Sequence, residues 1–272
     1  MLVLPQGCTR GLARDRGQDA LSGQGGADHR GGERHWPRDG RHHCARGRDR
    51  RRGRQQRGAA GPHGARIARG RGRAHGRLCN ALDPALVERT VASIARELGS
   101  IDILVNAVGG STIIPKSSAP VEELSFADWQ KLIDFNLSGT FLFTHAVVPA
   151  MKERRRGAIV NLASIAGRGL SISSSSAYAA AKGGIIAFTR KLAFELGPHG
   201  ITINAIAPSR TLTERIRPRW NQSSPEDQQA EIDRTPLRRV AEAPDQAKVI
   251  CFLASSDADF VTGVTIDVTG GN

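Results

Sequence analysis

Residues 176–197 read SAYAAAKGGIIAFTRKLAFELG, with apolar residues recurring at helical spacing. Tyr178 and Lys182 are four positions apart, so a helix places the phenol and the ammonium on one face. A nearby ammonium favours phenolate, and we expect it to lower the pKa of Tyr178 from about 10 toward neutral pH. The pair predicts a general acid/base for interconverting a carbonyl and an alcohol, although the same spacing also occurs on solvated helix faces.

The quoted helix belongs to a regular alternation of helices and strands. Strands rich in Ile and Val are expected at 101–110, 157–164, 200–208 and 263–271, and further helices at 83–99, 126–155 and 244–255. Such alternation predicts a Rossmann-like α/β fold, a doubly wound parallel sheet covered by helices on both faces in three layers. The active site of such a sheet lies at the carboxyl ends of its strands, where Ser164 follows one strand and can hydrogen-bond a reacting oxygen.

Four motifs in this part of the chain occur in a telling order: VNLASIAG, SAYAAAKGG, NAIAP and FLASSDADFVTGVTIDVTGG. Together they resemble the short-chain dehydrogenase/reductase family, most closely its 3-oxoacyl-acyl-carrier-protein reductase-like branch, from about residue 78 to residue 272. The resemblance implies an NAD(P)-dependent oxidoreductase acting on a secondary alcohol or ketone. It implies Tyr178 as the acid/base, Lys182 as its partner and a contact to the nicotinamide ribose, and Ser164 as the residue that orients the substrate carbonyl. Asn136, in IDFNLSGTF, matches an asparagine whose helix distortion holds a proton-relay water.

The resemblance also implies contacts to NAD or NADP, and no metal. The expected cofactor-binding residues are Asn80, Asn106, Ala107, Val108, Gly109, Tyr178, Lys182, Pro208, Ser209, Thr211 and Thr213. Three positions depart from the family pattern: the second Asn of N-N-A-G is Ala107, the Ala is Val108, and the Gly of P-G-x-x-x-T is Ser209. The interval from Ser164 to Tyr178 is one residue longer than usual and includes a serine run at 173–176, one of which could replace or assist Ser164.

The basic charge of the chain belongs to its first 77 residues. The net charge is +13, and residues 1–77 hold 19 Arg, no Lys and 6 acidic residues, which leaves residues 78–272 neutral. Arg-Gly clusters without apolar periodicity cannot bury enough surface to offset roughly 1–2 kcal/mol of backbone entropy per residue, so we expect residues 1–77 to be disordered. The glycine-rich turn T-G-x-x-x-G-x-G, which the family places after its first strand, is absent there.

A shifted reading frame accounts for this segment. When residues 25–40 are reverse-translated and read one base later, the codons permit V-A-L-I-T-G-G-A-S-G-I-G-R-A-M-A, which restores the strand and the turn. The restricted positions are informative: Trp36 followed by Pro37 can give only Gly. We therefore interpret residues 1–77 as an out-of-frame translation of the cofactor-binding β-α-β part, and residues 78–272 as the catalytic portion.

Two other interpretations stay open. The chain could be an inactive family remnant whose basic tail binds nucleic acid nonspecifically, although Trp36 is the tail's only aromatic residue and nucleic acid is an improbable partner. Alternatively, the printed chain exists but binds no dinucleotide tightly. In that case the strand at 101–105 would lack a partner along one edge and would promote aggregation.

The remaining expectations concern partners and location. The loop at 211–239 should cover the substrate, and its Arg215, Arg217 and Arg219 could meet an acid or an acyl carrier, or simply form a solvated helix face. Family members commonly form tetramers or dimers, which implies a homo-oligomer. The four cysteines show no paired spacing, and no apolar run approaches the roughly 18–20 residues that span a bilayer, so we expect a cytoplasmic protein without a membrane partner.

Overall fold

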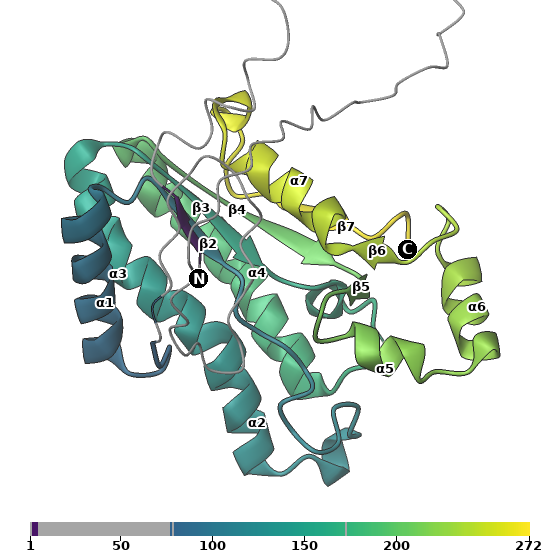
Figure 1. Ribbon diagram of the computed structural model, residues 1–272. Helices are drawn as coiled ribbons and strands as arrows, with labels where there is room; N and C mark the ends of the chain where they lie inside the picture. Colours follow the sequence, from purple (N-terminus) through teal and green to yellow (C-terminus); the bar gives the residue numbers. More distant parts are fainter. Residues whose placement is uncertain (1, 5–76, 78, 172) are drawn as a thin grey trace, which may run out of the picture. The chain divides into compact units, whose positions relative to one another are not determined.

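The computed structural model describes residues 2–4, 77, 79–171 and 173–272 (Figure 1). Its main sheet has the strand order β1-β2-β3-β4-β7. The strands are β1 (Leu2–Leu4), β2 (Ile103–Asn106), β3 (Gly157–Leu162), β4 (Ile201–Pro208) and β7 (Thr265–Val268). The pairs β2–β3, β3–β4 and β4–β7 are parallel. The predicted Rossmann-like parallel sheet is therefore confirmed.

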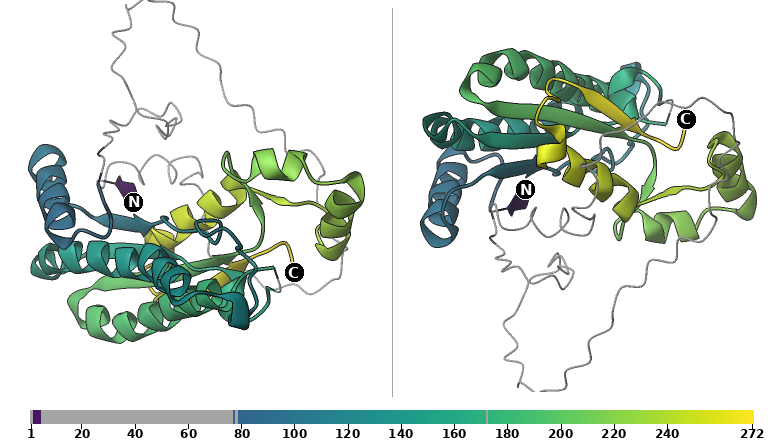
Figure 2. Two further views of the ribbon diagram at one scale, coloured as in Figure 1. Left: turned by 90° about the horizontal axis from the view of Figure 1, so that it is seen from below. Right: turned by 90° about the horizontal axis from the view of Figure 1, so that it is seen from above.

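Helices cover both faces of this sheet (Figures 1 and 2). On one face lie α1 (Pro84–Leu98), α3 (Gly139–Arg154) and α4 (Ser176–Leu196), and on the other lies α7 (Ala243–Leu253). Successive residues of β2 point to opposite faces, so Leu104 packs in the cluster with Val87 and Val147, whereas Ile103 packs in the cluster with Leu253. The three-layer arrangement follows from this alternation.

Local sequence signals set the ends of these helices. Asp83 caps α1 by accepting a hydrogen bond from the backbone N–H of Leu86, and Pro84 occupies the first helical position. The stretch predicted as one helix over 126–155 is α2 (Phe126–Ile133) and α3 joined by a π-helical turn over Asp134–Ser138. Such turns insert one extra residue and are frequent at functional sites.

The segment between β4 and α7 holds more regular structure than the polar loop expected there. It contains β5 (Thr211–Leu212), α5 (Arg217–Asn221), α6 (Pro225–Arg234) and β6 (Ala241–Glu242), and β5 pairs with β6 in parallel. Short 3-10 turns at Val121–Glu123, Ile165–Arg168, Gly197–His199 and Ser256–Ala258 complete the described elements. The loop is thus a small folded unit placed after the carboxyl end of β4.

One expectation about the sheet is wrong. The edge of β2 was expected to lack a partner, but β1 pairs with it in antiparallel register, with Leu2 opposite Val105 and Leu4 opposite Ile103. The three residues of β1 thus pair with Ile103 to Val105 along that edge. Residues 1 and 5–76 of the segment expected to be disordered lie outside the described residues, and these include residues 25–40, from which the shifted frame restores the turn.

Candidate active site

The first turns of α4 bring Tyr178 and Lys182 to the carboxyl end of β3. Ser175 starts this helix: its buried side chain accepts a hydrogen bond from the backbone N–H of Tyr178. Lys182 is 3% exposed, and its Nζ donates to the carbonyl of Leu162, the last residue of β3, at 2.7 Å. The same Nζ lies 5.9 Å from the centroid of the Tyr178 ring. The helix and the strand end together fix the phenol and the ammonium as a pair.

Ser164 joins this pair from the turn that follows β3. Its hydroxyl hydrogen-bonds the side chain of Tyr178 and also accepts from the backbone N–H of Ala166 at 3.2 Å. The serine run at 173–176 was expected as a possible substitute, and none of its members hydrogen-bonds the Tyr178 side chain in the described residues. Ser175 instead accepts a hydrogen bond from the backbone N–H of Tyr178.

Asn136 lies in the π-helical turn and is fully buried. Its Nδ2 donates to the carbonyls of Leu132 at 2.9 Å and Gly110 at 3.2 Å, and its Oδ1 accepts from the backbone N–H of Gly110 at 2.9 Å. A Cβ at Gly109 would lie 2.7 Å from the Oδ1 of Asn136 and 2.9 Å from the Nζ of Lys182. Glycine at 109 is therefore needed for the backbone after β2 to approach both side chains.

The expected cofactor-binding residues after β2 divide by exposure. Ala107 and Val108 are exposed beyond the strand end, where a ligand can reach them. The side chain of Asn106 points inward, donating to Thr144 at 3.1 Å and to the Oδ1 of Asn161 at 2.9 Å, while Asn161 donates to Thr189 at 2.9 Å. This buried polar chain links α3, β2, β3 and α4, so Asn106 offers a ligand only its backbone. The sequence did not signal this internal role.

The remaining expected cofactor contacts lie in turns. Asn80 is exposed, and its Oδ1 accepts from the backbone N–H of Leu82 before α1 begins. Pro208 ends β4, and Ser209 after it donates to the carbonyl of Thr269 at 3.4 Å. Thr211 donates to the carbonyl of Ser209 and accepts from Gln246. Thr213, in the next turn, is half-buried.

The electrostatics of the pair differ from the expectation. Burial raises the pKa of Tyr178 above 10.0, although the hydrogen bond from Ser164 and the charge of Arg215 act in the lowering direction. Burial, with the charge of Arg215, lowers the pKa of Lys182 to about 8. The prediction that Lys182 lowers the pKa of Tyr178 below 10 is therefore wrong for this state of the protein, because desolvation outweighs the charges around the phenol.

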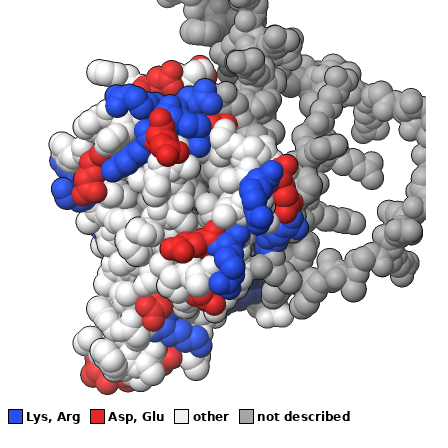
Figure 3. Space-filling view, turned by 90° about the vertical axis from the view of Figure 1, so that its left-hand side faces the viewer, with Lys and Arg blue, Asp and Glu red and all other residues white. Residues whose placement is uncertain are grey.

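The charged side chains on one face of the molecule are of mixed sign. On the face in Figure 3, basic and acidic side chains alternate and are separated by uncharged surface. Among the described residues, no helix is long and apolar enough to cross a membrane.

Comparison with known proteins identifies the family of this chain. Residues 55–272 match the family model described as enoyl-(acyl carrier protein) reductase. The chain is 40% identical over 187 residues to (2S)-[(R)-hydroxy(phenyl)methyl]succinyl-CoA dehydrogenase subunit BbsD of Thauera aromatica, covering 69% of this chain and 71% of that protein. It is 35% identical to the 3-oxoacyl-[acyl-carrier-protein] reductase of Escherichia coli, covering 72% of this chain and 76% of that protein.

Solved structures agree. A 3-oxoacyl-[acyl-carrier protein] reductase from Brucella melitensis with bound NAD is 37% identical, covering 71% of this chain and 69% of that one with a TM-score of 0.62. ElxO with NADP bound is 30% identical, covering 71% of this chain and 75% of that one with a TM-score of 0.65. The protein is an NAD(P)-dependent oxidoreductase. It belongs to the short-chain dehydrogenase/reductase family, as the resemblance implied, and the match begins at residue 55, ahead of the expected boundary.

The residues present fit the nicotinamide end of NAD or NADP. A phenol and a buried ammonium lie at the carboxyl ends of parallel strands, and the glycine at 109 lets the backbone after β2 approach the ammonium closely. The glycine-rich turn that would hold the pyrophosphate is absent from the sequence.

Proposed function

We propose that this protein interconverts a secondary alcohol and a ketone, with Tyr178 as the general acid/base. The carrying observation is the contact of the Tyr178 side chain with Ser164, beside the ammonium of Lys182. When bound, the nicotinamide supplies or accepts the hydride. In the reducing direction Tyr178 gives its proton to the carbonyl oxygen, and in the oxidising direction it takes the proton of the alcohol.

The neighbours of Tyr178 have separate roles in this proposal. Ser164 donates a hydrogen bond to the oxygen of the substrate and holds it within reach of the phenol. Lys182 stabilises the phenolate that forms when the proton leaves, and contacts the ribose of the cofactor. Asn136 is a positioning residue: it fixes Gly110 and keeps the π-helical turn open for a water that relays protons to Lys182.

The adenosine side of the cofactor is assigned to exposed backbone. Ala107, Val108 and the turn at Asn80 line it, and the Pro208–Thr213 segment borders the nicotinamide.

We also propose a cytoplasmic homo-oligomer, a tetramer or a dimer. Exposed aromatic side chains on the outer faces of α3 and α4 support it: Phe141 is 47% exposed, Phe194 is 75% exposed, and the Phe141 and Phe188 rings lie 6.3 Å apart.

The first 77 residues are proposed to be a frameshifted Rossmann half, so that the printed chain carries the proton-transfer residues without the pyrophosphate-binding turn. Sequencing the genomic DNA across codons 20–85 tests this directly. A missing or extra base would restore the turn, whereas confirmation of the printed frame would make the site a relic. A tight, stoichiometric NADH titration of the printed chain would refute the prediction that it binds dinucleotide weakly.

The activity test compares Tyr178→Phe with the parent chain, both translated from the corrected frame. The readout is NADH and NADPH absorbance with a panel of ketones. We expect kcat to fall about 10³-fold, because the general acid is removed while the ring still packs. A Tyr178→Phe chain that keeps more than about a tenth of the parent activity would overturn the assignment.

A further inference from the structure

Arg215 reaches the site from the segment that follows β5. A Cβ at Gly110 would lie 2.5 Å and 2.6 Å from the two terminal nitrogens of Arg215, so the guanidinium packs against the backbone of this glycine. Gly110 is itself held from its other side by Asn136, through both its N–H and its carbonyl. The guanidinium thus rests on the same backbone that borders Lys182.

The neighbouring arginines of the loop are committed elsewhere. Arg217 pairs with Glu242 at 2.5 Å and donates to the carbonyl of Leu212. Arg210 pairs with Glu231 at 3.3 Å. For Arg215 the described residues supply no carboxylate within 4.0 Å, and its side chain is exposed to solvent. Its donors are accessible to a ligand that enters the site.

Charge around the site is unbalanced. Lys182 and Arg215 are both cationic, and the charge of Arg215 acts to lower the pKa of Lys182 and of Tyr178. No acidic side chain of the described residues contributes to either shift. The buried ammonium of Lys182 would be stabilised by a negative charge nearby, and the exposed guanidinium of Arg215 can match the two oxygens of a carboxylate with paired hydrogen bonds.

We propose that Arg215 binds a carboxylate of the substrate, which makes the substrate a hydroxy acid or its oxo counterpart. This inference rests on the proposed function, because the carbonyl or alcohol carbon is placed at Tyr178 and Ser164. The carboxylate then lies over Gly110, and the distance between the two groups selects the length of the acid. Arg215 is a specificity-determining residue, and Arg217, which pairs with Glu242, is not part of the site.

A binding experiment tests this without turnover. In the printed chain with ¹³C-labelled lysine, NMR follows the titration of Lys182, whose pKa of about 8 separates it from ordinary lysines. The probes are lactate and 3-hydroxybutyrate, their neutral amides, and inorganic phosphate. We expect the hydroxy acids to raise the Lys182 midpoint because they neutralise Arg215, and the amides to leave it unchanged.

Two variants locate the effect. Arg215→Gln should raise the Lys182 midpoint of the free protein and abolish the response to carboxylates, whereas Arg219→Gln, on the same loop and exposed, should behave as the parent. A carboxylate response that persists in Arg215→Gln, or no response in the parent, would overturn the proposal. A response to phosphate alone would overturn it too, assigning Arg215 to a phosphate of a cofactor or thioester carrier.

Kinetics in the chain from the corrected frame separate this proposal from the proposed function. Arg215→Gln should raise KM for the oxo acid about 10- to 100-fold, as expected for a lost charged hydrogen bond, with little change for the neutral amide. Equal KM values for acid and amide in the parent would remove the carboxylate proposal while Tyr178→Phe still abolishes turnover. Full activity of Tyr178→Phe would instead remove the proposed function, and the carboxylate-binding result would stand by itself.

Discussion

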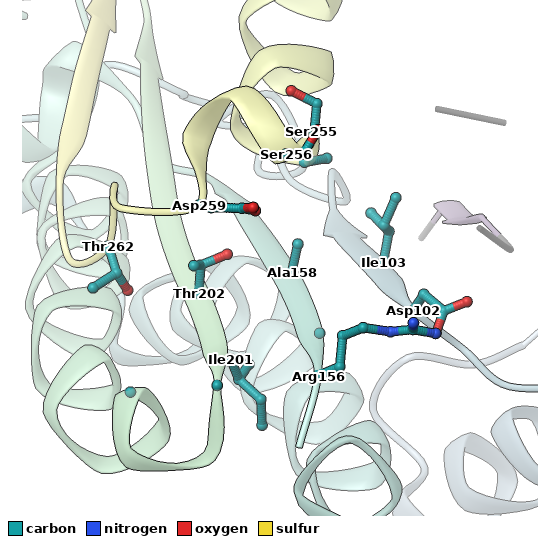
Figure 4. Close-up of a pocket in the computed structure, with 14 residues that line it drawn as sticks. Asp102, Ile103, Arg156, Ala158, Ile201, Thr202, Ser255, Ser256, Asp259 and Thr262 are labelled. Carbon is teal, nitrogen blue, oxygen red and sulfur yellow. The ribbon is translucent and has the colours of Figure 1, made fainter. Parts of the chain in front are cut away.

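The two ends of the same parallel strands treat buried charge in opposite ways. At the amino ends, a hollow of about 580 Å³ is lined by Asp102 and Arg156, among others (Figure 4). The carboxylate of Asp102 lies 3.1 Å from Arg156 and 4.0 Å from Arg154. At the carboxyl ends, Lys182 is 3% exposed, against 7% for Asp102, and the charge that contributes to its lowered pKa is that of another cation, Arg215. The buried charge at the amino ends has opposite charges beside it, which stabilise the fold. The buried charge at the carboxyl ends, where we propose that a ligand binds, has none in the part of the chain that the structure describes.

The largest expected contrast concerns Lys182. Its pKa of about 8 lies below the unfolded value of 10.5, so the unfolded chain binds more protons between these values and stability rises with pH across that window. Lys182→Met removes this pH-dependent contribution to the free energy of unfolding. The free energy of unfolding of the parent, relative to that of the variant, should therefore increase by about 3 kcal/mol from pH 7 to pH 10.

Urea unfolding at several pH values measures this difference. Lys191→Met, at an exposed position on the same helix where the lysine pairs with Glu195, is the matched control for the loss of a lysine. A flat difference for Lys182→Met would mean that the ammonium is not desolvated.

A smaller effect is expected from Ser164→Ala. We predict a loss of about 10²-fold in kcat in the corrected-frame chain, as for removal of one donor to a developing oxyanion. The same change should raise the pKa of Tyr178 further, because the hydrogen bond that lowers it is lost. Tyr178 is the chain's one tyrosine, so phenolate absorbance in an alkaline titration reports it without assignment. An unchanged titration curve would show that Ser164 does not touch the phenol.

At the amino ends, Asp102→Asn should act on stability and leave the site unchanged. It keeps the shape of a side chain that is 7% exposed but weakens its pairing with Arg156, and we expect a loss of about 1–2 kcal/mol in the free energy of unfolding. The Lys182 midpoint should stay where it is in the parent. Asp259→Asn, an exposed residue lining the same hollow, should change stability by less than about 0.5 kcal/mol. A shift at Lys182 would mean that the two ends are electrostatically coupled.

The smallest effect is expected from Ser175→Ala, which removes the cap of α4. A helix cap of this kind is worth about 1 kcal/mol, and the loss should appear as a lower midpoint in thermal unfolding. Ser176→Ala, one position further and exposed, changes no cap and serves as the comparison. Equal midpoints for the two variants would show that the Ser175 hydroxyl does not stabilise the helix start.

The features that the sequence predicted are those determined by residues close together in the chain. Apolar periodicity and capping residues gave α1 and α4 almost to the residue, and the spacing of Tyr178 and Lys182 placed both on one helix face. The features it missed depend on distant neighbours. The inward turn of Asn106 requires Asn161 from another strand, and the rise in the pKa of Tyr178 is a sum of burial over several elements.

The same limit applies to the loop and to the sheet edge. Arg215 and Arg217 are alike in the sequence, and only the contacts of the folded chain with Gly110 and Glu242 distinguish them. The pairing of β1 could not be foreseen because it joins residues about a hundred positions apart.

The direction of β1 limits what it can replace. Leu4, its last residue, lies opposite Ile103, the first residue of β2, so the chain leaves β1 at the end of the sheet remote from Tyr178. A strand that feeds a phosphate-binding turn must run the other way, so that its exit points at the carboxyl edge. β1 therefore pairs with the edge of the sheet, but its end does not lead to the carboxyl edge where a phosphate-binding turn would lie. A corrected reading frame would have to displace β1 from β2 before a parallel strand could occupy that edge.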